Sequence, residues 1–122
     1  MARVLVVEDM PDSAEIAAQI LRNYAHEVCL AQSAHEGLEL VAQFSPELIL
    51  YDYWLPDMDA RTFLSRLGAQ NASAGIRVVA CTAAPRAVIE QGLQGQQFHA
   101  YIFKPYRLSA FMQVVEEQLS LV

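Results

Sequence analysis

Polar side chains follow four apolar runs of the sequence, at the point where each run ends. They are Glu8-Asp9 after the first run, Asp52 after the run LILY, Thr82 after a run ending at Cys81, and Lys104-Pro105 after a run ending at Phe103. Clustered carboxylates repel one another, and a divalent cation that prefers oxygen ligands, such as Mg²⁺, removes that cost. A lysine can neutralise a carboxylate or a phosphoryl oxygen, and a threonine hydroxyl can donate to an oxygen that arrives later. Together these residues indicate a phosphoryl acceptor site.

Each member of this set has an expected role in such chemistry. Asp52 is the expected nucleophile, Glu8 and Asp9 are the expected metal-holding acids, and Thr82 and Lys104 are the expected phosphoryl-binding groups. The competing interpretation is that Asp52 simply opens a turn at the end of a strand. Four separate strands that each deliver a polar group at the same end favour the reactive interpretation.

A site of this kind needs elements that bring distant residues together. Apolar runs at 4–7, 27–30, 48–51, 76–81 and 98–103 predict five short strands, and the amphipathic segments between and after them predict five helices. Regular alternation predicts parallel strands, right-handed crossovers and helices on both faces of one sheet. Ligands bind at the carboxyl ends of the strands in such a sheet, so the polar groups are expected to share one crevice. Residues 70–75 are predicted to form a loop.

Helix boundaries follow from capping residues and from apolar spacing. The first helix is expected to begin with Asp12 as N-cap and Glu15 as its capping-box partner. Its buried face is expected to carry Ile16, Ile20, Leu21 and Tyr24. A second capping box is predicted at Ser33 and Glu36, and the last helix is expected over 107–119.

Composition restricts the classes of function. The chain has 122 residues, of which 54% are hydrophobic and 18% are charged, and this fits one domain spanning 1–122. A formal net charge of -6 argues against direct nucleic-acid binding and against an anionic membrane partner. No apolar run approaches about 20 residues, so no membrane insertion is expected. Two free cysteines in apolar runs and a short apolar amino end predict a cytoplasmic location.

These residues resemble the response-regulator receiver domains of two-component signalling, over essentially the whole chain. The resemblance is carried by the acidic pair Glu8-Asp9, by "DYWLPDMD" from Asp52, by Thr82 followed by Ala83, and by "YIFKP" ending in Lys104-Pro105. It implies a flavodoxin-like α/β fold, a doubly wound (βα)5 unit whose five parallel strands lie in the order 2-1-3-4-5 with helices on both faces.

The resemblance also implies ligands and partners. Asp52 would take a phosphoryl group from a phosphohistidine of a sensor histidine kinase or a histidine phosphotransfer protein. Asp9 and Asp52 would ligate Mg²⁺, Glu8 would act mostly through water, and the main-chain carbonyl of Trp54 would supply another oxygen. A downstream protein target and a phosphorylation-dependent dimer are further implied partners.

A conformational switch is implied at the neighbouring positions. Thr82 would move toward the phosphoryl group, for which the small Ala83 leaves room, and the ring of Tyr101 would turn into the vacated space. The resemblance also favours a cis peptide bond before Pro105. Such a switch makes the domain a signalling device that transfers phosphoryl groups only to itself and removes them slowly, and it is not expected to be an enzyme.

Two departures from the family pattern and one unusual residue affect these expectations. Ala60 stands where the family usually has glycine, and a positive φ there would cost alanine on the order of 1 kcal/mol. Gln97-Phe98 replaces a usual Gly-Ala pair, so the fourth helix and its exit are expected to be atypical. Trp54 either covers apolar surface or shields the acyl phosphate from water. Asp57 and Asp59 are expected to be loop and cap acids.

Other classes of protein fit the sequence less well. The main alternative is a pseudo-receiver or protein-interaction module that does not need phosphorylation, but the acids and lysine of the site are all present. Phosphatases with an aspartate nucleophile need a second acid two residues later, where this chain has Trp54. No glycine-rich phosphate-binding motif is present. The chain is expected to be a stand-alone receiver or a domain of a longer protein, with Met1 favouring a native amino end.

Overall fold

The computed structural model describes residues 1–70 and 75–122, and within them five parallel strands alternate with five helices. The elements are β1 (Arg3–Val7), α1 (Pro11–Asn23), β2 (Glu27–Ala31), α2 (Ala34–Phe44), β3 (Leu48–Tyr51), α3 (Ala60–Gly68), β4 (Arg77–Thr82), α4 (Arg86–Leu93), β5 (Ala100–Phe103) and α5 (Leu108–Leu119). The strand order is β2-β1-β3-β4-β5, as predicted. Most of the loop predicted at 70–75 falls on 71–74, outside the described residues.

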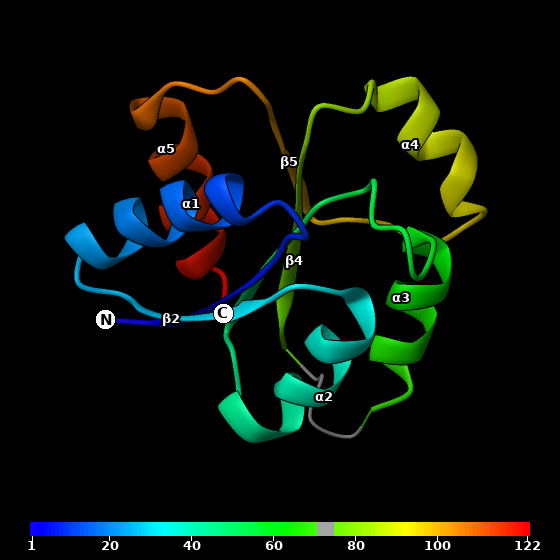
Figure 1. The fold of residues 1–122 in the computed structure, drawn as a ribbon, viewed down its shortest axis with the longest axis horizontal. Coiled ribbons are helices and arrows are strands. Elements are labelled where there is room, and N and C mark those ends of the chain that lie inside the picture. Colours follow the sequence, from blue (N-terminus) through cyan, green and yellow to red (C-terminus); the bar gives the residue numbers. More distant parts are fainter. Residues whose placement is uncertain (71–74) are drawn as a thin grey trace.

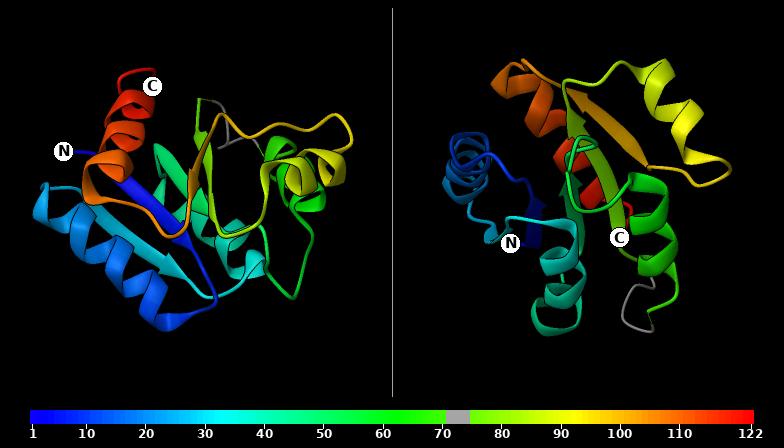
Figure 2. Two further views of the ribbon diagram at one scale, coloured as in Figure 1. Left: turned by 90° about the horizontal axis from the view of Figure 1, so that it is seen from above. Right: turned by 45° about the vertical axis from the view of Figure 1, so that its right-hand side comes forward.

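Helices cover both faces of the sheet, as Figures 1 and 2 show. Side chains of α1 and α5 pack on one face, where Leu21 and Phe111 are fully buried. Side chains of α2, α3 and α4 pack on the other face, where Phe63 and Ile89 are fully buried. All four residues of β3 are buried, which explains why this central strand has no polar alternation.

Helix α1 corrects two expectations from the sequence. It begins at Pro11 with Met10 as N-cap, so Asp12 lies inside the first turn and does not cap the helix. Proline suits the first helical position because its φ is already helical and its missing N–H would have no partner there. The buried face consists of Ala14, Ala17, Ala18 and Leu21, whereas Ile16 and Tyr24 are about half exposed. Ala17 and Leu21 belong to the core cluster on this face of the sheet, and Ile20 packs against it.

Helix α2 begins as the capping pattern predicts. The Ser33 hydroxyl accepts a hydrogen bond from the Glu36 N–H at 3.1 Å. The Glu36 carboxylate accepts from the backbone N–H of Gln32, one residue earlier than in a standard capping box.

Strand β5 starts two residues later than predicted, at Ala100. The two residues before it lie outside the strand. The Phe98 ring packs in the core against Tyr51, and the His99 Nδ1 accepts a hydrogen bond from the Val78 N–H at 2.9 Å. The family departure at Gln97-Phe98 therefore adds an aromatic side chain to the core at the exit of α4.

The other departure from the family pattern, Ala60 in place of glycine, causes no backbone strain. Ala60 is the first residue of α3, it is buried, and it is not among the residues with positive φ. The Asp59 carboxylate, an expected cap, accepts a hydrogen bond from the Thr62 N–H at 2.7 Å. The expected cost of alanine at this position was therefore wrong, because the chain is already helical there.

Candidate functional site

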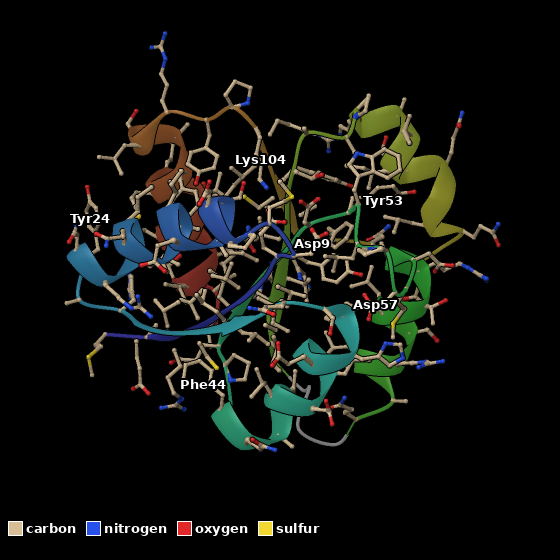
Figure 3. The ribbon with its side chains drawn as sticks, in the orientation of Figure 1. Asp9, Tyr24, Phe44, Tyr53, Asp57 and Lys104 are labelled. Atoms are coloured by element: carbon tan, nitrogen blue, oxygen red, sulfur yellow. The ribbon has the colours of Figure 1, made fainter. Side chains whose placement is uncertain are left out.

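Four strand ends meet at one end of the sheet, as the sequence predicts. Val7 pairs with Tyr51, Tyr51 with Ala80, and Thr82 with Phe103, so the residues that follow these strands come side by side. Figure 3 shows Asp9 and Lys104 at this end of the sheet, although 95 positions separate them in the chain. The flavodoxin-like strand order places a crevice here because the connections from β1 and β3 leave toward opposite faces.

Asp52 is held by donors from three different segments. Its Oδ1 accepts a hydrogen bond from the Thr82 hydroxyl at 2.7 Å and from the backbone N–H of Trp54 at 3.0 Å. Its Oδ2 lies 3.3 Å from the Lys104 Nζ. Asp52 is 8% exposed, and Thr82 is fully buried and accepts the Ala84 N–H. The carboxylate therefore has a fixed orientation and one edge open to solvent.

Glu8 and Lys104 form the second half of the site. The Lys104 ammonium pairs with Glu8 Oε1, and Glu8 Oε2 accepts the Met10 N–H at 3.3 Å. Burial raises the pKa of Glu8, and the charge of Asp52 adds to this increase, although Lys104 opposes both effects. Burial alone would lower the pKa of Lys104, but the Glu8 and Asp52 carboxylates outweigh it, so its pKa is raised. Lys104 is thus kept as a cation between two acids.

The acidic residues suit a hard divalent cation. Oxygen atoms of Glu8, Asp9 and Asp52 all lie within 4.8 Å of one another. This donor set consists only of oxygens, the ligand type that Mg²⁺ prefers, and three carboxylates exceed the single charge of Lys104. The residues present therefore fit a magnesium ion. Asp9 is the more exposed member of the acidic pair.

The remaining predicted residues lie around this centre. Ala83 and Pro105 are exposed at the rim, and the Lys104–Pro105 peptide bond is cis, as predicted. Tyr101 is partly buried on β5, with its ring stacked on Phe103 and the Arg86 guanidinium 4.5 Å above it. Trp54 is 56% exposed, and its backbone N–H donates a hydrogen bond to Asp52 Oδ1.

A family model for the response regulator receiver domain matches residues 4–116. The chain belongs to the response regulator receiver family. The receiver domain is 30% identical over 121 residues to the probable C4-dicarboxylate response regulator DctR of Priestia megaterium, covering 96% of this chain and 51% of that protein. It is 26% identical to the polar-differentiation response regulator DivK of Brucella ovis, covering 95% of this chain and 94% of that protein. The receiver domain spans about half the length of DctR and of the regulator RpaA of Synechocystis.

Solved structures show the same fold. A CheY-like receiver domain protein from Methanospirillum hungatei superposes with a TM-score of 0.86 at 27% identity, covering 98% of this chain and 94% of that one. The receiver domain of the sensor histidine kinase PA1611 from Pseudomonas aeruginosa superposes with a TM-score of 0.89 at 19% identity, covering 98% of both chains. That structure carries a magnesium ion coordinated in its active-site cleft.

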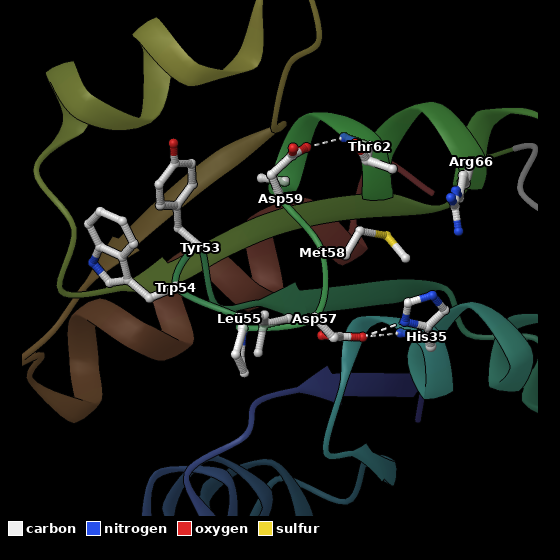
Figure 4. A pocket seen from close by; sticks show the side chains of 11 residues that line it. His35, Tyr53, Trp54, Leu55, Asp57, Met58, Asp59, Thr62 and Arg66 are labelled. Atoms are coloured by element: carbon white, nitrogen blue, oxygen red, sulfur yellow. Dashed lines mark hydrogen bonds and ion pairs between the residues drawn. The ribbon is translucent and has the colours of Figure 1, made fainter.

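Some contacts of the receiver domain could not be read from the sequence. Asp57 caps α2 from the β3–α3 loop: its carboxylate accepts the Ala34 and His35 N–H groups at 3.1 and 3.0 Å and pairs with the His35 ring. Burial opposes ionisation, but these hydrogen bonds hold the pKa of Asp57 below its usual value. Figure 4 shows this pair at the wall of an open cavity of about 600 Å³ beside the loop. No local motif predicts a cap supplied from 22 residues away.

Among the described residues, the helices are all too short or too polar to cross a bilayer.

Proposed function

We propose that the receiver domain is a phosphorylation-dependent signalling switch in which Asp52 accepts a phosphoryl group from a phosphohistidine of a sensor histidine kinase or histidine phosphotransfer protein. The observation that carries this proposal is the arrangement around Asp52. One carboxylate is oriented by Thr82, Trp54 and Lys104, and it lies beside two further acids. Membership of the receiver family supports the same conclusion.

Glu8, Asp9 and Asp52 would hold a magnesium ion, with the main-chain carbonyl of Trp54 as a further oxygen ligand. When bound, Mg²⁺ would neutralise charge on the carboxylate and phosphoryl oxygens. Two observations support this assignment: the three carboxylates approach within 4.8 Å of one another, and the related PA1611 receiver domain carries magnesium in its cleft.

The transfer step requires little of the protein beyond positioning and charge. An Asp52 oxygen forms a bond to phosphorus while the bond between phosphorus and the donor histidine nitrogen breaks, and that nitrogen keeps the bonding electron pair. Lys104 already lies 3.3 Å from Asp52 Oδ2, so its charge is in place to stabilise phosphoryl oxygens. In this proposal the domain transfers the phosphoryl group only to its own Asp52 and removes it slowly, so it is not proposed to be an enzyme.

The switch follows from the loss of one hydrogen bond. The Thr82 hydroxyl donates to Asp52 Oδ1 in this structure, and after phosphorylation it would donate to a phosphoryl oxygen. Movement of Thr82 would leave space for the Tyr101 ring, which is now held at the surface under Arg86. The phosphoryl group shifts the population because it contacts the two states differently. A downstream protein would read the rearranged surface of α4 and β5, and the kinase partner would place the exchange in the cytoplasm.

Acetyl phosphate tests the assignment without knowledge of the kinase. Incubation with and without Mg²⁺, followed by intact-mass measurement, should show one added phosphoryl group in the wild type only when Mg²⁺ is present. Asp52→Asn should abolish the modification. Asp59→Asn, which changes an acid that caps α3 outside the site, should leave it unchanged. Modification of Asp52→Asn at the wild-type level would place the acceptor elsewhere, and no modification of the wild type would favour a pseudo-receiver.

A further inference from the structure

Helix α4 has a glycine where the Tyr53 hydroxyl approaches its backbone. A Cβ atom added to Gly92 would lie well under 3.0 Å from the Tyr53 hydroxyl oxygen and 3.4 Å from the ring carbon Cζ. Gly92 lies in the last turn of α4, and glycine has a lower helix propensity than alanine. The close approach of Tyr53 accounts for a glycine here, because any side chain at position 92 would displace the ring.

Tyr53 belongs to the acceptor loop, directly between Asp52 and Trp54. Its ring makes an edge contact with the Trp54 ring at a centroid distance of 4.9 Å and packs, partly buried, against the core on the α2–α4 face. Figure 4 shows the ring pointing from the loop toward α4. The hydroxyl could move aside by rotation of the side chain about χ1, which would give up the ring's contacts with Trp54 and with the core, or by movement of the loop that carries the ring.

We propose that Gly92 is a positioning residue for the acceptor site. The missing side chain at position 92 leaves a notch in α4 that receives the Tyr53 hydroxyl. The notch would thereby fix Tyr53 and the loop backbone between Asp52 and Trp54. This inference rests on the proposed function. The two flanking residues supply the acceptor carboxylate, a proposed carbonyl ligand and the N–H that orients Asp52. A shift of Tyr53 therefore alters the metal site directly. Since coupling is reciprocal, a partner that moves α4 changes Mg²⁺ affinity, and Mg²⁺ changes the affinity for that partner.

Gly92→Ala tests the notch, and the chain offers a matched control. Gly68 lies in α3, and a Cβ added there meets nothing within 4 Å, so Gly68→Ala changes helix propensity without a clash. A rescue variant combines Tyr53→Phe with Gly92→Ala, since loss of the hydroxyl leaves Cζ at 3.4 Å, an ordinary contact. Trp54 is the sole tryptophan and reports on the loop by fluorescence, both without metal and during a Mg²⁺ titration.

We expect Gly92→Ala to shift the metal-free Trp54 emission and to weaken Mg²⁺ binding about tenfold, in the range found for groups that orient metal ligands. Gly68→Ala should bind as the wild type does, and the double variant should bind as Tyr53→Phe alone does. A purely structural role of the glycine would make the two alanine variants behave alike. If Gly92→Ala does not fold, Tyr53→Ala, which empties the notch, should weaken Mg²⁺ binding by a similar factor.

The outcomes separate this inference from the proposed function. Wild-type Mg²⁺ affinity in Gly92→Ala, or a loss that Tyr53→Phe does not restore, would overturn the positioning role while the acceptor assignment stands. A wild-type protein that neither binds Mg²⁺ nor reacts with acetyl phosphate would overturn the proposed function and this inference together.

Discussion

Tyr51 carries a buried hydroxyl with no hydrogen-bond partner in the part of the chain that the structure describes, and its removal should stabilise the protein. The side chain is fully buried, and its hydroxyl has no hydrogen-bond partner among residues 1–70 and 75–122. Its ring stacks on Phe63 at a centroid distance of 4.2 Å and contacts Phe98. Tyr51→Phe keeps these ring contacts and deletes only the orphaned oxygen. An unpaired buried polar group costs about 1–3 kcal/mol, so we expect a gain of about 1 kcal/mol.

Urea unfolding followed by circular dichroism measures this gain. With a slope of about 2 kcal/mol per molar urea for a domain of this size, the midpoint should rise by roughly 0.5 M. Tyr24→Phe is the matched control, because that side chain is 49% exposed and its hydroxyl reaches water. An unchanged or lower midpoint for Tyr51→Phe would refute the reasoning and show that the hydroxyl has a partner.

The advantage of Tyr51→Phe should grow in alkaline solution. Burial, with smaller contributions from Asp57, Asp59 and Asp52, raises the pKa of Tyr51 above its usual value. The unfolded chain ionises its tyrosine near pH 10, whereas the folded protein keeps the proton, so ionisation favours the unfolded state as the pH rises above that value. Tyr51→Phe has no hydroxyl to ionise at this position, so it does not lose stability in this way. The difference in midpoint between the two proteins should therefore be constant up to about pH 9 and widen above pH 10.

Three further substitutions test other contacts of the site and its loop. Asp57→Ala should destabilise the fold by about 1 kcal/mol at pH 7, because it removes the cap of α2. The pKa of Asp57 is lowered in the folded protein, so its contribution is lost when the carboxylate is protonated in acid. The urea midpoints of the variant and the wild type should therefore converge as the pH falls below about 3.9. Lys104→Met should lower the free energy of unfolding by roughly 2–3 kcal/mol in magnesium-free buffer, because it leaves the buried Glu8 carboxylate without its cation. Thermal melts should show that added Mg²⁺ restores part of this loss. Trp54→Asn should speed dephosphorylation several-fold if the exposed ring shields the acyl phosphate; an unchanged half-life, measured by loss of the phosphoryl mass, would assign the ring to surface packing alone.

The parallel fold and the acceptor residues were predictable because strong local signals coincide. The run LILY has no polar alternation, which marks a strand covered on both faces, and the order of strands follows from the family resemblance. Because the carboxyl ends of parallel strands lie at the same end of a sheet, polar residues directly after the strands can be placed there from the sequence alone. The sequence predicted that Asp52, Thr82 and Lys104 meet at one end of the sheet, and the structure places them there, joined by hydrogen bonds that the sequence did not predict.

Other features depend on contacts between distant segments. The first helix was placed by capping preference at Asp12, whereas the fixed φ of Pro11 starts it earlier. Its large apolar residue Ile16 is 56% exposed, whereas Ala14, Ala17 and Ala18 are buried, and apolar spacing gave these small residues less weight. Likewise, the close approach of the Tyr53 hydroxyl to Gly92 could not be predicted from the sequence, because 39 positions separate the two residues.

The lysine that bridges Glu8 and Asp52 has a consequence for how quickly the domain can respond. The ammonium serves as an internal counterion for Glu8 and Asp52, so these two acids stay close together despite their mutual repulsion. A divalent ion bound by the three acids would find carboxylate oxygens that already lie within 4.8 Å of one another. Its binding would therefore need little rearrangement of these side chains, which would favour rapid loading of the site.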